Sequence, residues 1–129
     1  MAGHGRTWPV EFRVYCERGK VIGVSAYYPQ AAVEDDRLTR HGVAQATAHA
    51  EAVLRTMADR GLVPSHRAVD PAIAAACTLD FLQLPDGGVV LLEGGPPWTP
   101  RWGASPCCFG GEKPSGLALV NRGTEPDGW

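Results

Sequence analysis

Residues 77–98 read CTLDFLQLPDGGVVLLEGGPPW, and this stretch decides the fold because it predicts two β-strands joined by a tight turn. Apolar and β-branched residues flank Asp86-Gly87, a pair that accepts the positive φ angles of a two-residue hairpin loop. Centring the turn there places Asp80 opposite Glu93, and a symmetric four-residue loop over 85–88 gives the same register. A three-residue loop would shift the register by one and turn the two carboxylates to opposite faces.

The predicted opposition of Asp80 and Glu93 puts two like charges into an apolar ladder, where they repel each other unless something compensates. A divalent cation would do so, since Mg²⁺ is usually held by carboxylate oxygens together with phosphate oxygens and waters. The alternative is that both acids lie near strand ends and are simply hydrated. For a metal-free repulsive pair, Asp80→Asn and Glu93→Gln should leave the fold intact or slightly stabilise it.

A second hairpin is predicted near the start of the chain. Residues 10–16 (VEFRVYC) alternate, residues 21–28 (VIGVSAYY) are rich in β-formers, and a turn centred on Arg18 and Gly19 joins them. The alternation places Glu11, Arg13 and Tyr15 on one face of the first strand, with an apolar set on the other face. Arg13 is therefore presented outward, and a functional role for it requires an anion nearby.

One long amphipathic helix is predicted over residues 37–60, because its apolar residues recur at spacings of three and four. Asp35-Asp36 offers the N-cap, Gly61 the stop, and Gly42 weakens the first turns. Residues 117–120 could add a short edge strand. The predicted fold class is α+β: an antiparallel sheet built from two hairpins with this helix.

Composition indicates a cytoplasmic protein. The 129 residues include 12 Lys and Arg against 14 Asp and Glu, which gives no electrostatic case for nucleic acid or an anionic membrane. No apolar run is long enough to span a bilayer, and the first residues lack an apolar signal core. Cys16, Cys77, Cys107 and Cys108 have no metal-ligand spacing, so reduced, partly buried thiols are expected.

The order of elements and two motifs resemble the C-terminal half of the ATP-grasp fold. Small ATP-grasp proteins have strands that read like EFRVFV-GKVVAVSRYYPQ and, later, LDVGVLEDG-WVLVEVNPFW. The matching stretches here are EFRVYCERGKVIGVSAYYPQ at 11–30 and LDFLQLPDGGVVLLEGGPPW at 79–98. The resemblance implies an ATP-grasp-like C-terminal subdomain over residues 9–103, followed by a loop-rich tail over 104–129.

The resemblance also implies site residues and cofactors. Asp80 and Glu93 would hold Mg²⁺ against the phosphates of ATP, and Arg13 would contact the phosphoryl or acyl-phosphate oxygens, which makes it the candidate catalytic residue. The loop from Trp98 to Trp102 would border the acceptor site. The family's third metal ligand, an Asn, is replaced by Gly95.

Three functions remain open from the sequence. The first is a partial, truncated ATP-grasp module with ATP- and Mg²⁺-dependent carboxylate–amine ligase chemistry. Its missing N-terminal lobe, which carries the family's phosphate-gripping lysines, would come from another chain or a longer gene product; a homo-oligomer is also open. The second is a degenerate, non-catalytic binding or scaffold protein. The third is an unrelated small α+β protein whose acids are incidental.

Overall fold

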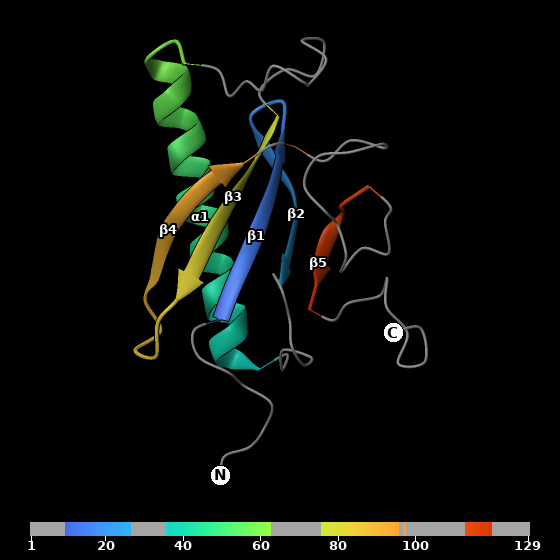
Figure 1. The fold of residues 1–129 in the computed structure, drawn as a ribbon, viewed down its shortest axis with the longest axis vertical. Helices are drawn as coiled ribbons and strands as arrows, with labels where there is room; N and C mark the ends of the chain where they lie inside the picture. Colours follow the sequence, from blue (N-terminus) through green and yellow to red (C-terminus); the bar gives the residue numbers. More distant parts are fainter. Residues whose placement is uncertain (1–9, 27–35, 63–75, 96, 98–112, 120–129) are drawn as a thin grey trace.

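The computed structural model describes residues 10–26, 36–62, 76–95, 97 and 113–119. Five strands form one sheet in the order β4-β3-β1-β2-β5, and the helix α1 packs across one face of it (Figure 1). The elements are β1 (Val10–Glu17), β2 (Lys20–Ala26), α1 (Arg37–Asp59), β3 (Cys77–Gln83), β4 (Val89–Gly95) and β5 (Gly116–Ala118). The predicted α+β class is confirmed.

The sheet is mixed, so the prediction of a purely antiparallel sheet is wrong. β5 runs parallel to β2, with Val24 opposite Leu117, and forms the edge of the sheet. A three-residue strand carries too little pattern to reveal its direction, and parallel pairing requires a long connection that local turn signals do not encode. The short edge strand expected at residues 117–120 is found at Gly116–Ala118, within the stretch predicted as a tail, and it is hydrogen-bonded into the sheet.

The first hairpin turns at Arg18 and Gly19 as predicted, with Glu17 opposite Lys20. The register then shifts by one between Tyr15 and Cys16, because β2 carries an extra residue there. The predicted alternation of β1 is confirmed, since Phe12 and Val14 belong to the core while Arg13 lies on the other face.

The second hairpin has the predicted pairing of Asp80 with Glu93, but its loop differs from the predicted one. Its loop has three residues, Pro85 to Gly87, closed by a hydrogen bond from the Leu84 N–H to the Gly88 carbonyl, and Gly87 has a φ of 92°. Such a loop alone would place the two acids on opposite faces. A bulge on β4, where the register shifts between Asp80 and Phe81, restores the pairing of Asp80 with Glu93.

The helix α1 begins and ends close to the predicted positions. The Asp36 carboxylate accepts a hydrogen bond of 2.8 Å from the Thr39 N–H, and Gly61 follows the last turn with a φ of 69°. Gly42 is buried where α1 crosses Gln83 of β3, and a Cβ at position 42 would lie 2.6 Å from Gln83 Nε2. This glycine therefore allows close packing of the helix on the sheet, besides lowering helix propensity.

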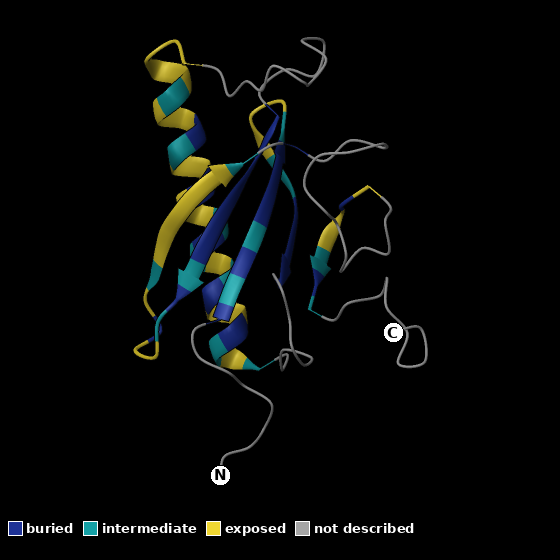
Figure 2. Cartoon of the chain, in the orientation of Figure 1, coloured by how far each residue is buried: buried dark blue, intermediate teal, exposed yellow. Residues whose placement is uncertain are grey.

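The core fills the space between α1 and the sheet. Its buried members come from the helix-facing positions of three strands and from one face of the helix: Val10, Phe12, Val14, Cys16, Val24, Ala46, Ala50, Leu54, Cys77, Leu79 and Phe81. The strands β1 and β3 are buried along most of their length, whereas β4 is largely exposed (Figure 2). Within the described residues, no helix is both long and apolar enough to cross a membrane.

Candidate functional site

Three predicted site residues lie side by side across the sheet. Glu93 on β4 opposes Asp80 on β3, and Asp80 opposes Arg13 on β1. Directly opposed residues share a face of a sheet, and Phe12 and Leu79, one position away, belong to the core under α1. The row Arg13–Asp80–Glu93 is therefore on the face opposite the helix.

Arg13 and Asp80 form a bidentate ion pair. Arg13 Nε donates to Asp80 Oδ1 at 2.8 Å, and Arg13 Nη2 donates to Asp80 Oδ2 at 2.9 Å. The two side chains are only 12% and 6% exposed, so the pair is shielded from water. Two parallel charge-assisted hydrogen bonds are the strongest arrangement that a guanidinium and a carboxylate can form.

This ion pair supplies the charge compensation for which the sequence left two possibilities open, a bound cation or hydration of both acids. The facing acids do oppose each other, but Arg13 is on the other side of Asp80 and neutralises it. Removing the Asp80 charge would leave a guanidinium that is largely desolvated and has lost this partner. The expectation that Asp80→Asn leaves stability unchanged or improved therefore does not fit this structure.

Glu93 differs from Asp80 in its surroundings. It is exposed on the edge strand β4, whereas Asp80 is buried. Among the residues that the structure describes, no group of three or more His, Cys, Asp or Glu side chains could hold a metal ion by itself. Arg13 occupies one acceptor position on each oxygen of Asp80, and a carboxylate has about four such positions. Asp80 and Glu93 therefore fit Mg²⁺ only when phosphate oxygens and waters complete its shell.

A third acid, Glu11, adds negative charge to the same face. Burial raises the pKa of Glu11 above its ordinary value of 4.5; the Asp80 carboxylate raises it further, Arg13 lowers it, and Glu93 raises it. Glu11 lies two residues from Arg13 on β1, which places it on the same side of the sheet. The face around the row therefore favours the binding of cations or protons.

The position expected to carry a third metal ligand is Gly95, opposite Thr78. A Cβ at position 95 would lie 2.9 Å from Thr78 Oγ1, which is closer than side-chain atoms normally approach. A larger residue would therefore require Thr78 to move. Within the described residues, the row offers two carboxylates and no amide ligand at this position.

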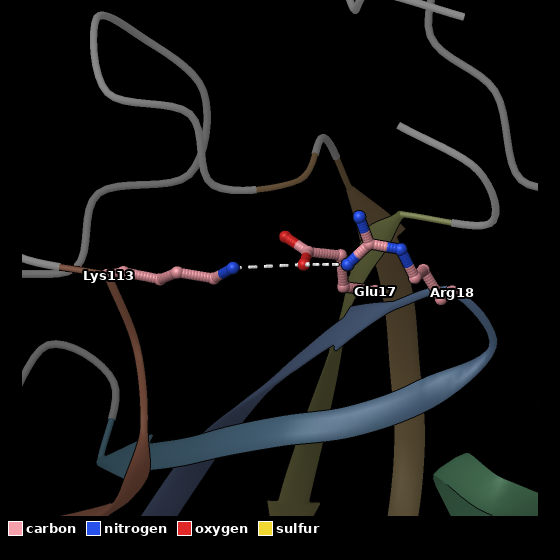
Figure 3. A network of polar contacts seen from close by, with 3 residues as sticks. All are labelled: Glu17, Arg18 and Lys113. Atoms are coloured by element: carbon pink, nitrogen blue, oxygen red, sulfur yellow. Dashed lines mark hydrogen bonds and ion pairs between the residues drawn. The ribbon is translucent and has the colours of Figure 1, made fainter. Parts of the chain in front are cut away.

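Both lysines of the chain, Lys20 and Lys113, lie away from the Arg13–Asp80–Glu93 row. Lys113 Nζ contacts Glu17 Oε1 at 3.0 Å, and Arg18 Nη1 contacts the same oxygen at 3.2 Å (Figure 3). These exposed contacts join the turn of the first hairpin to the segment before β5, and Lys20 lies beside the same turn. Neither lysine is placed to bind phosphates at Asp80.

An apolar groove of about 530 Å³ lies between α1 and the edge strand β4. Val53 and Met57 line it from the helix, and Phe81 and Leu91 line it from the sheet. Phe81 belongs to the helix-facing core, so the groove and the Arg13–Asp80–Glu93 row are on different sides of the sheet. The loop from Trp98 to Trp102, together with Cys107 and Cys108, falls outside the described residues.

Comparison with protein-family models, with curated proteins and with solved structures finds no match to the chain. The resemblance to the ATP-grasp fold therefore remains a prediction from the two sequence motifs. The fold and the geometry of the row stand independently of it.

The pairing of Arg13 with Asp80 is the feature that sequence reasoning missed. A signal existed: each is a charged residue in the middle of a mostly apolar strand, and buried charges need partners. The sequence does not show that β1 and β3 are neighbours in the sheet, because β2 and α1 separate them in the chain.

Proposed function

We propose that Arg13, Asp80 and Glu93 form one half of a Mg²⁺–ATP site of ATP-grasp type. The observation that supports this most directly is their placement as consecutive neighbours in one row on one face of the sheet. In this proposal Asp80 and Glu93 hold the cation, and Arg13 turns part of its guanidinium towards phosphate oxygens. The motifs at 11–30 and 79–98 add the family resemblance.

The described residues supply only part of such a site, and the proposal requires a second contributor. The phosphate-gripping lysines would come from an N-terminal lobe, supplied by another chain or by a longer gene product. Among the described residues, β4 is the last strand on its side of the sheet, and its Val90, Leu91 and Leu92 are 43%, 46% and 48% exposed. An open apolar edge beside Glu93 would suit the docking of such a chain. We place the protein in the cytoplasm.

The proposed reaction is a carboxylate–amine ligation. With ATP and Mg²⁺ bound, a substrate carboxylate would be activated as an acyl phosphate and then attacked by an amine. The role of this chain would be electrostatic: Arg13 stabilises negative charge on phosphoryl oxygens, and the two carboxylates position the cation.

A second candidate function is a non-catalytic binding or scaffold module on the same fold. Two observations favour it. Both oxygens of Asp80 already accept hydrogen bonds from Arg13. Gly95 replaces the amide ligand at a position where a Cβ would require Thr78 to shift. In this case the row is a structural ion pair with an exposed acid beside it.

Calorimetric titration of the chain with Mg²⁺–ATP at millimolar concentration separates the two candidates. The matched variants are Glu93→Gln, which removes an exposed acid from the row, and Glu51→Gln, which removes an exposed acid from α1. The first candidate predicts binding that weakens roughly tenfold or more in Glu93→Gln and is unchanged in Glu51→Gln. No heat of binding in the wild type, or equal binding in all three proteins, would overturn the nucleotide site in favour of the scaffold.

A further inference from the structure

Two cysteines face each other across the centre of the sheet. Cys16, near the end of β1, is directly opposite Cys77, the first residue of β3. Both are free thiols, with exposed fractions of 3% and 8%, and both belong to the core beneath α1. They come from strands far apart in the sequence, so their opposition results from the fold.

The spacing of these positions matches what a disulfide requires. Directly opposed residues of an antiparallel pair have Cα atoms about 4.5 to 5.5 Å apart, whether or not they are a hydrogen-bonded pair. Disulfides join Cα atoms that are about 4.4 to 6.8 Å apart. The two side chains also leave the sheet on the same face, so the two positions meet the general requirements for a disulfide.

We propose that Cys16 and Cys77 are a redox-active dithiol that closes to a disulfide between β1 and β3 when the chain meets a peroxide. One thiolate attacks a peroxide oxygen; the O–O bond breaks, a sulfenic acid forms and one water leaves. The second thiol loses its proton, and its sulfur attacks the sulfenic sulfur; the S–O bond breaks and a second water leaves. Two thiols are thus oxidised by two electrons as one hydrogen peroxide is reduced to two waters.

The two sulfurs have different roles in this reaction. The hydrogen bond with Cys77 and then burial raise the pKa of the Cys16 thiol, whereas the same hydrogen bond lowers the pKa of Cys77 against the opposing effect of burial. Cys77 is also the more exposed of the two. The greater exposure of Cys77 makes it the sulfur that peroxide reaches first, and Cys16 is then the resolving thiol.

Closing this bond would link the strands that carry Arg13 and Asp80. The cross-link lies three residues along the same ladder from that ion pair. Because it joins two distant segments, it restricts the unfolded chain strongly and stabilises the folded form. The oxidised protein should unfold about 10 °C above the reduced protein.

Peptide mapping of the full chain after treatment with hydrogen peroxide tests the proposal. After blocking free thiols, denaturation and trypsin digestion, we expect a cross-link between peptides 14–18 and 68–101, which contain Cys16 and Cys77 and neither Cys107 nor Cys108. The linked pair should disappear on reduction with dithiothreitol. A digest in which both peptides carry blocked thiols, or in which either is joined to the peptide with Cys107 and Cys108, would overturn the proposal.

Variants extend the test to stability. In a Cys107→Ser/Cys108→Ser background, peroxide should raise the unfolding temperature reversibly, and Cys77→Ala in that background should abolish the rise. An equal rise in Cys77→Ala would refute the assignment. If the background variant does not fold, the peptide map of the wild-type chain still decides.

Discussion

Arg13 on β1 donates two hydrogen bonds to the two carboxylate oxygens of Asp80 on β3, at 2.8 and 2.9 Å. This pair links strands that are not consecutive in the sequence, and it neutralises the acid that faces Glu93. Its burial makes it sensitive to the removal of either partner, whereas Glu93 is exposed.

The first prediction concerns the charge on Asp80. Asp80→Asn should lower the free energy of unfolding by about 3 kcal/mol, because the largely buried Arg13 then loses its counter-charge. Glu93→Gln should change it by less than about 0.5 kcal/mol, since that acid is exposed. Urea unfolding, monitored by circular dichroism, measures the free energy of unfolding of both variants. Equal stability of wild type and Asp80→Asn would contradict a structural role for the ion pair.

The second prediction uses both partners at once. Asp80→Leu alone should strongly lower the free energy of unfolding. Arg13→Met/Asp80→Leu should recover about 2 kcal/mol or more of it, because the buried guanidinium is then no longer left without the Asp80 carboxylate. The four unfolding free energies of a double-mutant cycle give this coupling. Simple additivity of the single effects would show that the two side chains do not depend on each other.

The third prediction concerns the contact between α1 and β3. At an ordinary helix position, Gly→Ala raises the free energy of unfolding by up to about 1 kcal/mol. At Gly42 the new Cβ would displace the buried Gln83 amide, which donates a 2.8 Å hydrogen bond to the Leu38 carbonyl. Loss of that bond in the core costs about 1 to 3 kcal/mol, so Gly42→Ala should be destabilising overall by about 1 kcal/mol.

A matched control for Gly42→Ala is Ala44→Gly, at an exposed position of the same helix. Ala44→Gly should lower the free energy of unfolding by about 1 kcal/mol, because glycine has a lower helix propensity than alanine. Thermal unfolding of both variants measures the difference. A gain in stability for Gly42→Ala would mean that Gln83 can move aside without loss.

The fourth prediction is the pH dependence contributed by Glu11. Because its pKa is raised in the folded chain, its contribution to stability is fully present below the unfolded value of 4.5 and is lost as the pH rises through the folded value. Glu11→Gln should therefore stabilise the protein at pH 7 relative to wild type, and the difference should shrink towards pH 4. Unfolding experiments across this range provide the measurement. A difference that grows as the pH falls would have the wrong sign.

Local features of this protein could be read from its sequence. The turn at Arg18-Gly19, the helix after Asp36 and the two faces of β1 were all predicted, because side-chain periodicity and capping residues act over a few positions. The opposition of Asp80 and Glu93 was also correct, although it results from a three-residue loop and a bulge that cancel each other.

Two hairpins, one amphipathic helix and the two faces of β1 could be predicted from the sequence, since these features depend on neighbours in the chain. Three relationships are visible only in the folded chain: β3 lies beside β1, β5 runs parallel to β2, and Gly42 packs closely against the Gln83 side chain. Those relationships join segments distant in sequence, so they depend on how the whole sheet packs against α1. The same strand order brings Arg13 to Asp80 and Cys16 to Cys77.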